Sequence, residues 1–209
     1  MNPAVQFLQN GPNHAEMTLM LAHGAGTPMD TPFMTTVAKG VAATGIRVLR
    51  FEFPYMSEKN RTSKRRPPDP KPILLDSWRT AFAASGKGRT VIGGKSMGGR
   101  MASLVADELG ATGLVCLGYP FHPSGKPERP RTEHLRSLRT KALFVQGERD
   151  PFGMPLEIEN YGLSAEVRIH WIVDGNHDLK PRKKSGRTLE QNMAEAIAAI
   201  TVFLDKLSS

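Results

Sequence analysis

The sequence has one cysteine, few aromatic residues and no long apolar run, and each shortage excludes a class of protein. Because Cys116 is the only cysteine of the 209 residues, no disulfide forms within the chain and a reducing, cytoplasmic compartment is expected. No stretch approaches the roughly 20 apolar residues of a membrane-spanning helix. Residues 1–10 lack the basic start and apolar run of a signal peptide. We therefore expect a soluble, unexported protein without a membrane partner.

The net charge of +8 is concentrated in three stretches of the chain. Residues 54–72, 120–139 and 178–187 carry net charges of +4, +3 and +4, and the rest of the chain carries −3. Such stretches are usually solvated surface, whereas a ring of them around a pocket would attract anionic small-molecule substrates. Both interpretations stay open. Nucleic acid is the least favoured partner, since the 14 aromatic residues leave few in the basic stretches to stack on bases.

Short apolar runs alternate with helical patterns from about residue 16 onward, which is typical of βαβ units and a mostly parallel sheet. The six predicted strands are Met17–Ala22, Ile46–Phe51, Thr90–Gly93, Gly113–Leu117, Ala142–Gln146 and Arg168–Val173. A seventh, Ala4–Leu8 within residues 1–15, is predicted to pair antiparallel with the first through a turn at residues 10–13. We expect one α/β domain over residues 1–209, with helices on both faces and no large cap.

Four helices are predicted from apolar stripes with start or stop signals. The first begins at Thr31-Pro32, the second runs from Pro72 to Gly86, and the third follows Ser96 and ends at Gly110. The fourth begins at Thr188, where Gln191 three residues later completes a capping box. The basic, proline-rich residues 54–72 are expected to form an irregular loop.

A serine stands between an apolar strand and an amphipathic helix in residues 91–100, Val-Ile-Gly-Gly-Lys-Ser-Met-Gly-Gly-Arg. Residues 94–98 fit the pattern G-x-S-x-G, in which a strained turn lifts the serine above the sheet. Ser96 would then lie at a helix N-terminus, where free N–H groups favour a developing oxyanion. The end of a phosphate-binding P-loop looks similar, but Arg89 stands where that motif begins with glycine. The nucleophile elbow is therefore the favoured interpretation.

A serine hydroxyl is a weak nucleophile until a base takes its proton and an acid orients that base. Asp150 follows the predicted strand at residues 142–146, and His177 follows the one at residues 168–173. Because the carboxyl ends of parallel strands share one edge of the sheet, Ser96, Asp150 and His177 can meet there. The sequence predicts that these three residues form a catalytic triad.

A second oxyanion donor is expected in the loop after the first core strand. This loop reads His23-Gly24-Ala25-Gly26, and its small residues let the main chain approach a substrate closely. The predicted oxyanion hole consists of the backbone N–H groups of Ala25 and Met97. His23 is interpreted as a residue that shapes this loop.

Three other acids compete with Asp150 for the orienting role. Asp174 and Asp178 share the loop of His177, where reaching the imidazole needs a tight local fold, and Glu148 is the third. Asp150 is favoured on these grounds. Lys95 and Arg100, which flank the elbow, are interpreted as structural or rim charges.

A metal site is the main alternative for the histidine loop. His170, Asp174, His177 and Asp178 could supply ligands on paper, but His170 lies inside a predicted strand and no recognised ligand spacing appears. We expect neither a metal nor a cofactor.

Taken together, these segments resemble an α/β hydrolase of the small, lidless kind near dienelactone hydrolases. Within that fold the chain resembles the testis-expressed and NSL-complex-subunit hydrolase-like proteins, some of which are scaffold subunits. The stretches that carry the resemblance are residues 22–26, 51–55, 93–100, 118–123, 131–135, 146–151 and 175–178. The resemblance implies a Ser-Asp-His hydrolase acting on an ester, thioester or small amide. A catalytically silent interaction protein stays open as the alternative.

Overall fold

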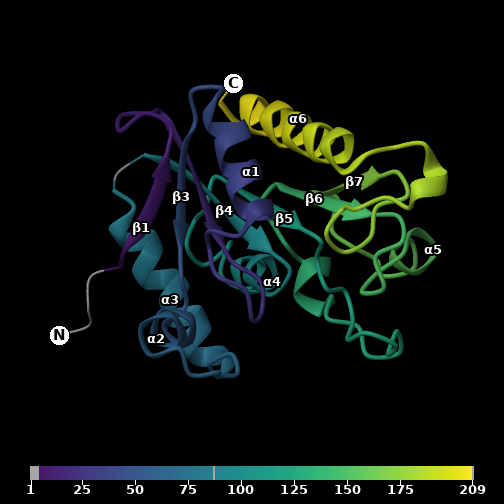
Figure 1. The fold of residues 1–209 in the computed structure, drawn as a ribbon, viewed down its shortest axis with the longest axis horizontal. Helices are drawn as coiled ribbons and strands as arrows, with labels where there is room; N and C mark the ends of the chain where they lie inside the picture. Colours follow the sequence, from purple (N-terminus) through teal and green to yellow (C-terminus); the bar gives the residue numbers. More distant parts are fainter. Residues whose placement is uncertain (1–4, 87, 209) are drawn as a thin grey trace.

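Seven strands form one twisted sheet in the computed structural model, which describes residues 5–86 and 88–208 (Figure 1). The strand order is β1-β3-β2-β4-β5-β6-β7. Strands β2 to β7 are parallel to their neighbours, and β1 is antiparallel to β3 at the edge. The strands are β1 (Phe7–Asn10), β2 (Met17–Ala22), β3 (Arg47–Phe51), β4 (Arg89–Lys95), β5 (Gly113–Leu117), β6 (Ala142–Gly147) and β7 (Val167–Ile172).

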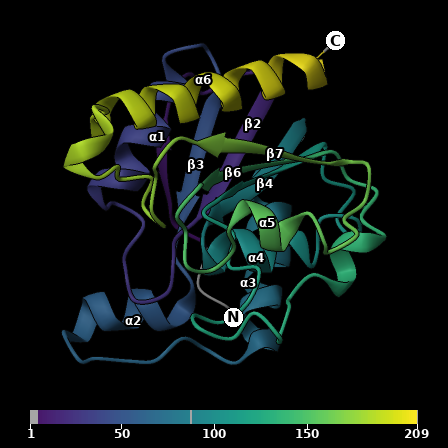
Figure 2. The ribbon, with the colours of Figure 1, turned by 90° about the vertical axis from the view of Figure 1, so that its right-hand side faces the viewer.

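Helices cover both faces of this sheet (Figure 2). On one face α1 (Pro32–Ala42) and α6 (Leu189–Ser208) pack against apolar side chains of the strands. The helices of the other face are α2 (Pro54–Thr62), α3 (Lys71–Ala84), α4 (Met97–Ser103) and α5 (Pro155–Ile158). Short 3-10 turns lie at Glu133–Arg136 and Lys183–Ser185. The predicted fold class is confirmed: a mostly parallel sheet with helices on both faces and, among the described residues, no large cap.

Burial explains why the central strands read as continuous apolar runs. Every residue of β2, β5 and β6 is buried, as expected where helices cover both faces of a parallel sheet. The predicted helix starts are also present. The Thr31 hydroxyl accepts a hydrogen bond from the amide of Met34, and Thr188 and Gln191 form the reciprocal bonds of a capping box.

The edge strand differs from its prediction in partner and position. It spans Phe7–Asn10 and pairs with β3, with Phe7 opposite Phe51, whereas pairing with β2 was expected. The physical reason is that β2 lies inside the sheet, with β3 on one side and β4 on the other. Its two edges are therefore taken, and β3 offers the free one. Residues 1–4, including the predicted start at Ala4, lie outside the described residues.

The prediction of a loop across residues 54–72 is wrong for its first half. Pro54–Thr62 forms α2, with proline at the first helical turn and Ser63 in a left-handed conformation, φ 57°, at its end. Only Tyr55 and Met56 of this helix are buried. An apolar stripe this short gives little periodic signal.

The helix after Ser96 is shorter than predicted, since α4 ends at Ser103 and turns continue to Gly110. The amides of Leu104 and Val105 bond to carbonyls three residues back, and the Ser103 hydroxyl donates to the carbonyl of Arg100. Tightened turns and side-chain bonds to the backbone both end regular α-helix.

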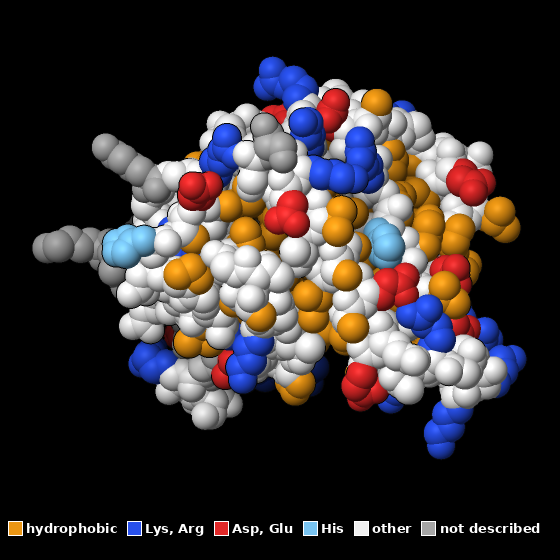
Figure 3. Space-filling model, turned by 90° about the horizontal axis from the view of Figure 1, so that it is seen from above, with side chains coloured by type: hydrophobic (Ala, Val, Ile, Leu, Met, Phe, Trp, Pro, Cys, Tyr) orange, Lys and Arg blue, Asp and Glu red, His pale blue; other side chains and the backbone are white. Residues whose placement is uncertain are grey.

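Charge on the face drawn in Figure 3 is dispersed. Lys and Arg side chains lie in the upper part of this view and toward its lower left and lower right, with Asp and Glu among them and hydrophobic side chains between. Among the described residues, no helix has the length and apolar character needed to cross a membrane.

The packing of α6 generates a stability prediction with an internal control. Ile200 is fully buried on this helix, whereas the side chain of Val202 is 51% exposed. Ile200→Ala is expected to lower the free energy of unfolding by about 2–5 kcal/mol because it leaves a cavity. Val202→Ala should change it by less than about 0.5 kcal/mol. Urea unfolding measures both, and equal losses would contradict the packing of α6 described above.

Candidate active site

Ser96 lies at the sharp turn between β4 and α4 in a strained backbone conformation. Its dihedral angles are φ 49° and ψ −114°, outside the regions that residues with a side chain normally occupy. The amide of Ser96 donates to the carbonyl of Leu117 at the end of β5, 2.9 Å away, which ties the turn to the neighbouring strand. The half-buried side chain stands at the N-terminal end of α4.

Close main-chain contact explains why glycine follows two residues after the serine. A Cβ atom at Gly98 would lie 2.4 Å from the carbonyl oxygen of Ala22 and 2.6 Å from that of His23. Helix α4 can therefore start against the end of β2 only if residue 98 has no side chain. This contact brings the loop after β2 beside the elbow.

Asp150 and His177 meet beyond the ends of β6 and β7. Their Oδ2 and Nδ1 atoms are 2.8 Å apart. Asp150 is fully buried, and its carboxylate also accepts hydrogen bonds from Gln146 Nε2 at 3.0 Å and from the amide of Phe152 at 2.9 Å. Three bonds to one buried carboxylate satisfy its charge and fix its orientation.

The backbone of His177 is held over the end of β5 by the lysine next to Ser96. Lys95 is buried, and its Nζ donates to the carbonyl of His177 at 2.8 Å and lies 3.1 Å from Asp178. Burial lowers the pKa of Lys95, and the carboxylate of Asp178 opposes that shift. Gly118, with φ 61°, leaves the room, because a Cβ there would lie 2.8 Å from the same carbonyl oxygen. Lys95 is thus a structural residue and not a rim charge.

The competing acids have other partners. Asp174 forms ion pairs with Arg182 and Arg149, and hydrogen bonds from Arg182 lower its pKa to about 2. Asp178 pairs with Lys95, and Glu148 accepts a hydrogen bond from the amide of Asp174. Asp150 alone of the four is bonded to the imidazole of His177.

The predicted oxyanion donors lie on two segments that touch. A Cβ at Gly24 would lie 3.5 Å from Cγ of Lys95, so the loop after β2 runs beside the elbow. The amide of Gly26 donates to the hydroxyl of Tyr55. Within the described part of the chain, the amides of Ala25 and Met97 donate no hydrogen bond. Two free N–H groups on adjoining segments are what an oxyanion hole requires.

His23 joins this loop to the segment after β3. The imidazole is fully buried, with Nδ1 2.8 Å from the carbonyl of Gly24, while Nε2 accepts from the amide of Phe53 at 3.1 Å. Burial lowers its pKa to about 4, although the bond to Gly24 acts in the opposite direction. A neutral ring with one donor and one acceptor fits both contacts. His23 thus shapes the loop, as its position in the sequence indicated.

Two residues of this arrangement were missed or undervalued in the sequence. Gln146 is fully buried and donates a hydrogen bond to Asp150. In the sequence it is only the polar residue that ends an apolar run, which gives no sign of this role. The interpretation of Lys95 as a structural or rim charge does not foresee its hydrogen bond to the carbonyl of His177. His170, considered above as a metal ligand, lies 3.2 Å from Glu195 of α6 and does not join His177. Among residues 5–86 and 88–208, the Ser96 hydroxyl and His177 are not hydrogen-bonded to each other.

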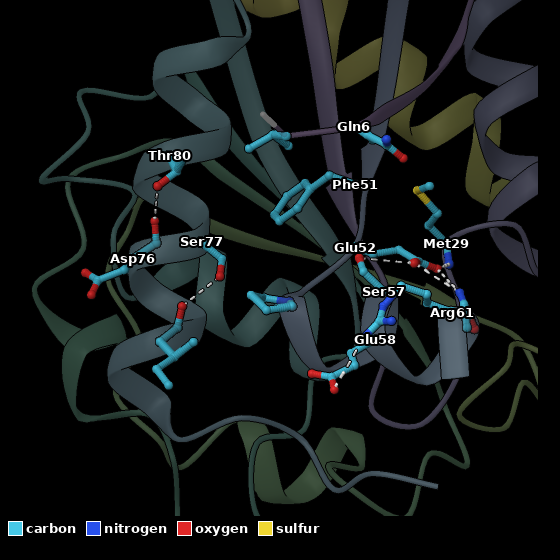
Figure 4. A pocket seen from close by; sticks show the side chains of 14 residues that line it. Gln6, Met29, Phe51, Glu52, Ser57, Glu58, Arg61, Asp76, Ser77 and Thr80 are labelled. Carbon is cyan, nitrogen blue, oxygen red and sulfur yellow. Dashed lines mark hydrogen bonds and ion pairs between the residues drawn. The ribbon is translucent and has the colours of Figure 1, made fainter. Parts of the chain in front are cut away.

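A groove of about 870 Å³ lies elsewhere, between the segment that precedes β1, the end of β3, α2 and α3 (Figure 4). Ser57 and Glu58 line it from α2, and Asp76 and Ser77 from α3. Burial raises the pKa of Glu52 in its wall. Neither Ser96, Asp150 nor His177 lines this groove.

Solved structures of similar fold support the architecture. Dienelactone hydrolase from Anabaena variabilis matches with a TM-score of 0.69 and 19% identity, covering 93% of this chain and 89% of its own. Est1E from Butyrivibrio proteoclasticus matches with a TM-score of 0.72 and 12% identity, covering 97% of this chain and 94% of its own. A serine hydrolase without a lid from Xanthomonas campestris matches with a TM-score of 0.66 and 16% identity, covering 96% of this chain and 91% of its own. At these identities the likeness concerns the fold.

A mostly parallel sheet with a strained serine at a strand-to-helix turn defines the α/β hydrolase class. The family described as the alpha/beta hydrolase domain matches residues 15–205, and the chain belongs to it. The resemblance to lidless, dienelactone-hydrolase-like members is confirmed at the level of fold. The narrower resemblance to NSL-complex-subunit proteins stays a prediction.

The buried imidazole of His23 generates a prediction about acid stability. Its pKa falls from 6.5 in the unfolded chain to about 4 in the folded protein, so the unfolded state binds a proton first as the pH falls. Its contribution to stability is full above pH 6.5 and is lost as the pH falls from about 6.5 to 4, by on the order of 3 kcal/mol.

Urea unfolding at several pH values tests this expectation with His23→Asn and His14→Asn. The first variant should flatten the pH dependence of the unfolding free energy, although His134, whose pKa is also about 4, keeps part of it. The second, at an exposed histidine, should leave the slope unchanged. Identical slopes in all three proteins would show that His23 does not titrate in this way.

Proposed function

We propose that the protein is a serine hydrolase that cleaves an ester, thioester or small amide through an acyl-enzyme. Ser96 attacks the carbonyl carbon, His177 takes the proton of its hydroxyl, and Asp150 holds the imidazole. The amides of Met97 and Ala25 stabilise the oxyanion. A small-molecule substrate in a cytoplasmic setting is part of this proposal.

The observation that carries the proposal is the pairing of a buried carboxylate with a partly exposed imidazole on the edge where the strained serine lies. The side chain of Asp150 is 0% exposed and that of His177 is 21% exposed, at 2.8 Å separation. A carboxylate that accepts from Nδ1 leaves Nε2 free to act as base, which is the division of roles in a catalytic triad. The bond between Asp150 and His177 therefore supports the assignment more directly than the serine motif alone.

In the acylation step, the Ser96 hydroxyl loses its proton to His177 as its oxygen bonds to the carbonyl carbon. The tetrahedral oxyanion collapses, the bond to the leaving group breaks, and the imidazolium returns its proton to that group. Water then repeats the sequence on the acyl-enzyme and releases the acid. The buried charge of Asp150 stabilises the imidazolium in both halves.

Labelling with a neutral fluorophosphonate tests this assignment. The wild-type protein is expected to be modified, Ser96→Ala should not be labelled, and Asp150→Asn should slow labelling by roughly 10²–10⁴-fold because an amide does not hold the imidazole in the tautomer whose Nε2 accepts a proton. Mass spectrometry of the intact protein measures the extent and the position of modification.

Ser137→Ala is the control, since Ser137 is exposed and lies after the 3-10 turn at Glu133–Arg136. It should label at the wild-type rate. Persistent labelling of Ser96→Ala would refute Ser96 as the nucleophile. A wild-type protein that is folded but never labelled would instead favour a catalytically silent interaction protein.

A further inference from the structure

Several basic side chains in the basic stretches of this protein have partners. Arg182 and Arg187 of the stretch 178–187 pair with Asp174 and Glu195. In the stretch 54–72, Arg66 pairs with Glu58 and Lys59 donates to the carbonyl of Gly26. These contacts neutralise or occupy part of the positive charge that the sequence concentrates in its basic stretches.

Arg100 and Arg131 are the exceptions. Within residues 5–86 and 88–208, they are the only basic residues that are half-buried and yet donate no side-chain hydrogen bond and have no carboxylate within 4.0 Å. The Nε atom of Arg100 and the hydroxyl of Thr132, which follows Arg131 in the sequence, are both buried without a hydrogen-bond partner. Leaving such groups unpaired costs free energy that a bound anion would recover.

Hydrogen bonds join the segments that carry these two arginines. The Ser103 hydroxyl donates to the carbonyl of Arg100 and lies 2.8 Å from His134 Nε2. The Tyr119 hydroxyl donates to the carbonyl of Arg131 at 3.1 Å. The contact between Ser103 and His134 therefore joins helix α4 to the segment after β5, so the two segments that carry the arginines lie side by side.

The charged side chains that shift the pKa values of Arg131 and His134 are all positive. Burial lowers the pKa of Arg131, and repulsion by Arg100 adds to that shift. Burial, Arg100 and Lys71 together lower the pKa of His134 to about 4, so this imidazole is neutral at pH 7. Tyr119 acts in the opposite direction on Arg131, and no aspartate or glutamate contributes to either shift.

The cluster is also close to the elbow. The amide of Arg100 bonds to the carbonyl of Ser96 at 3.0 Å, so Arg100 lies one turn of α4 beyond the serine and on the same side of the helix. One turn is about 5.4 Å. A small ester can span that distance.

We propose that Arg100 and Arg131 bind a carboxylate or phosphate group of the substrate, so that the enzyme acts on esters or thioesters with an anionic end. This inference rests on the proposed function. Guanidinium groups suit it because their planar donors match the two oxygens of such a group. The anion replaces the missing counter-charge, and its place sets the distance from the charged end to the scissile carbonyl.

Two esters separate this inference from general hydrolysis: 4-nitrophenyl hemisuccinate, which is anionic, and 4-nitrophenyl butyrate, which is neutral. For the wild-type protein, kcat/KM for the anionic ester should fall more steeply with NaCl. Arg100→Gln and Arg131→Gln should each lower the ratio of kcat/KM for the anionic to the neutral ester by roughly ten- to hundredfold. Arg168→Gln, at an exposed arginine of β7, should leave that ratio unchanged.

A binding measurement covers the case in which neither ester is cleaved. Calorimetry with Ser96→Ala protein and either monomethyl succinate or methyl phosphate should detect binding that Arg131→Gln weakens by at least about tenfold. The two ligands distinguish a carboxylate site from a phosphate site. Thermal unfolding of each variant excludes simple loss of fold.

Failures of the two proposals look different. Labelled protein that hydrolyses both esters with unchanged selectivity in Arg100→Gln and Arg131→Gln would overturn the anion site and leave the hydrolase intact. Anion binding that depends on Arg131, in protein that neither labels nor cleaves esters, would overturn the hydrolase and leave an anion-binding protein. No binding and no change in selectivity overturns this inference in either case.

Discussion

The close approach of three main-chain segments at one edge of the sheet is the constraint on which the site depends. The start of α4 lies so near the carbonyl oxygens at the end of β2 that residue 98 has no room for a side chain. The same contact sets the loop of Ala25 beside the elbow, and the amide of Ser96 fixes the turn to β5. Strain at φ 49° persists because the surrounding parallel strands hold it there.

Three buried polar side chains complete that frame, and each of the three has partners. Asp150 has three donors, Lys95 has a carbonyl and a carboxylate, and the ring of His23 has a donor and an acceptor. Such networks rigidify a site when they are fully satisfied, since a missing partner is costly in a low dielectric. The two histidines have different environments. Buried His23 holds the loop after β2 through its two ring nitrogens, whereas the imidazole of His177 is partly exposed.

Much of the fold could be predicted because local signals agreed with the global arrangement. The buried parallel strands are continuous apolar runs, and the capping residues Thr31 and Thr188 indicate where two helices begin. The predictions that were wrong concern features that depend on tertiary context. The partner of β1 follows from which strand edges remain free, and α2 buries only Tyr55 and Met56, which is too little for a periodic pattern.

The candidate site was predictable to a similar depth. Strand ends bring Asp150 and His177 together in a parallel sheet, so their meeting follows from topology. The roles of Gln146 and Lys95 do not follow from topology. Both are polar residues at strand ends, and the sequence does not show whether such a residue is solvated or, as here, buried. The unpaired state of Arg100 and Arg131 is also invisible in a sequence, where counting charges cannot show which have partners.

The short antiparallel strand β1 has a consequence for how this molecule meets others. A bare edge on β3 would present a row of unpaired N–H and C=O groups, which invites a strand from another chain. Phe7–Asn10 occupies that row over Val48–Phe51, and with four residues β1 itself offers only a short edge in return. Growth of the sheet by strand addition is therefore disfavoured on this side, because the edge that β1 presents is only four residues long.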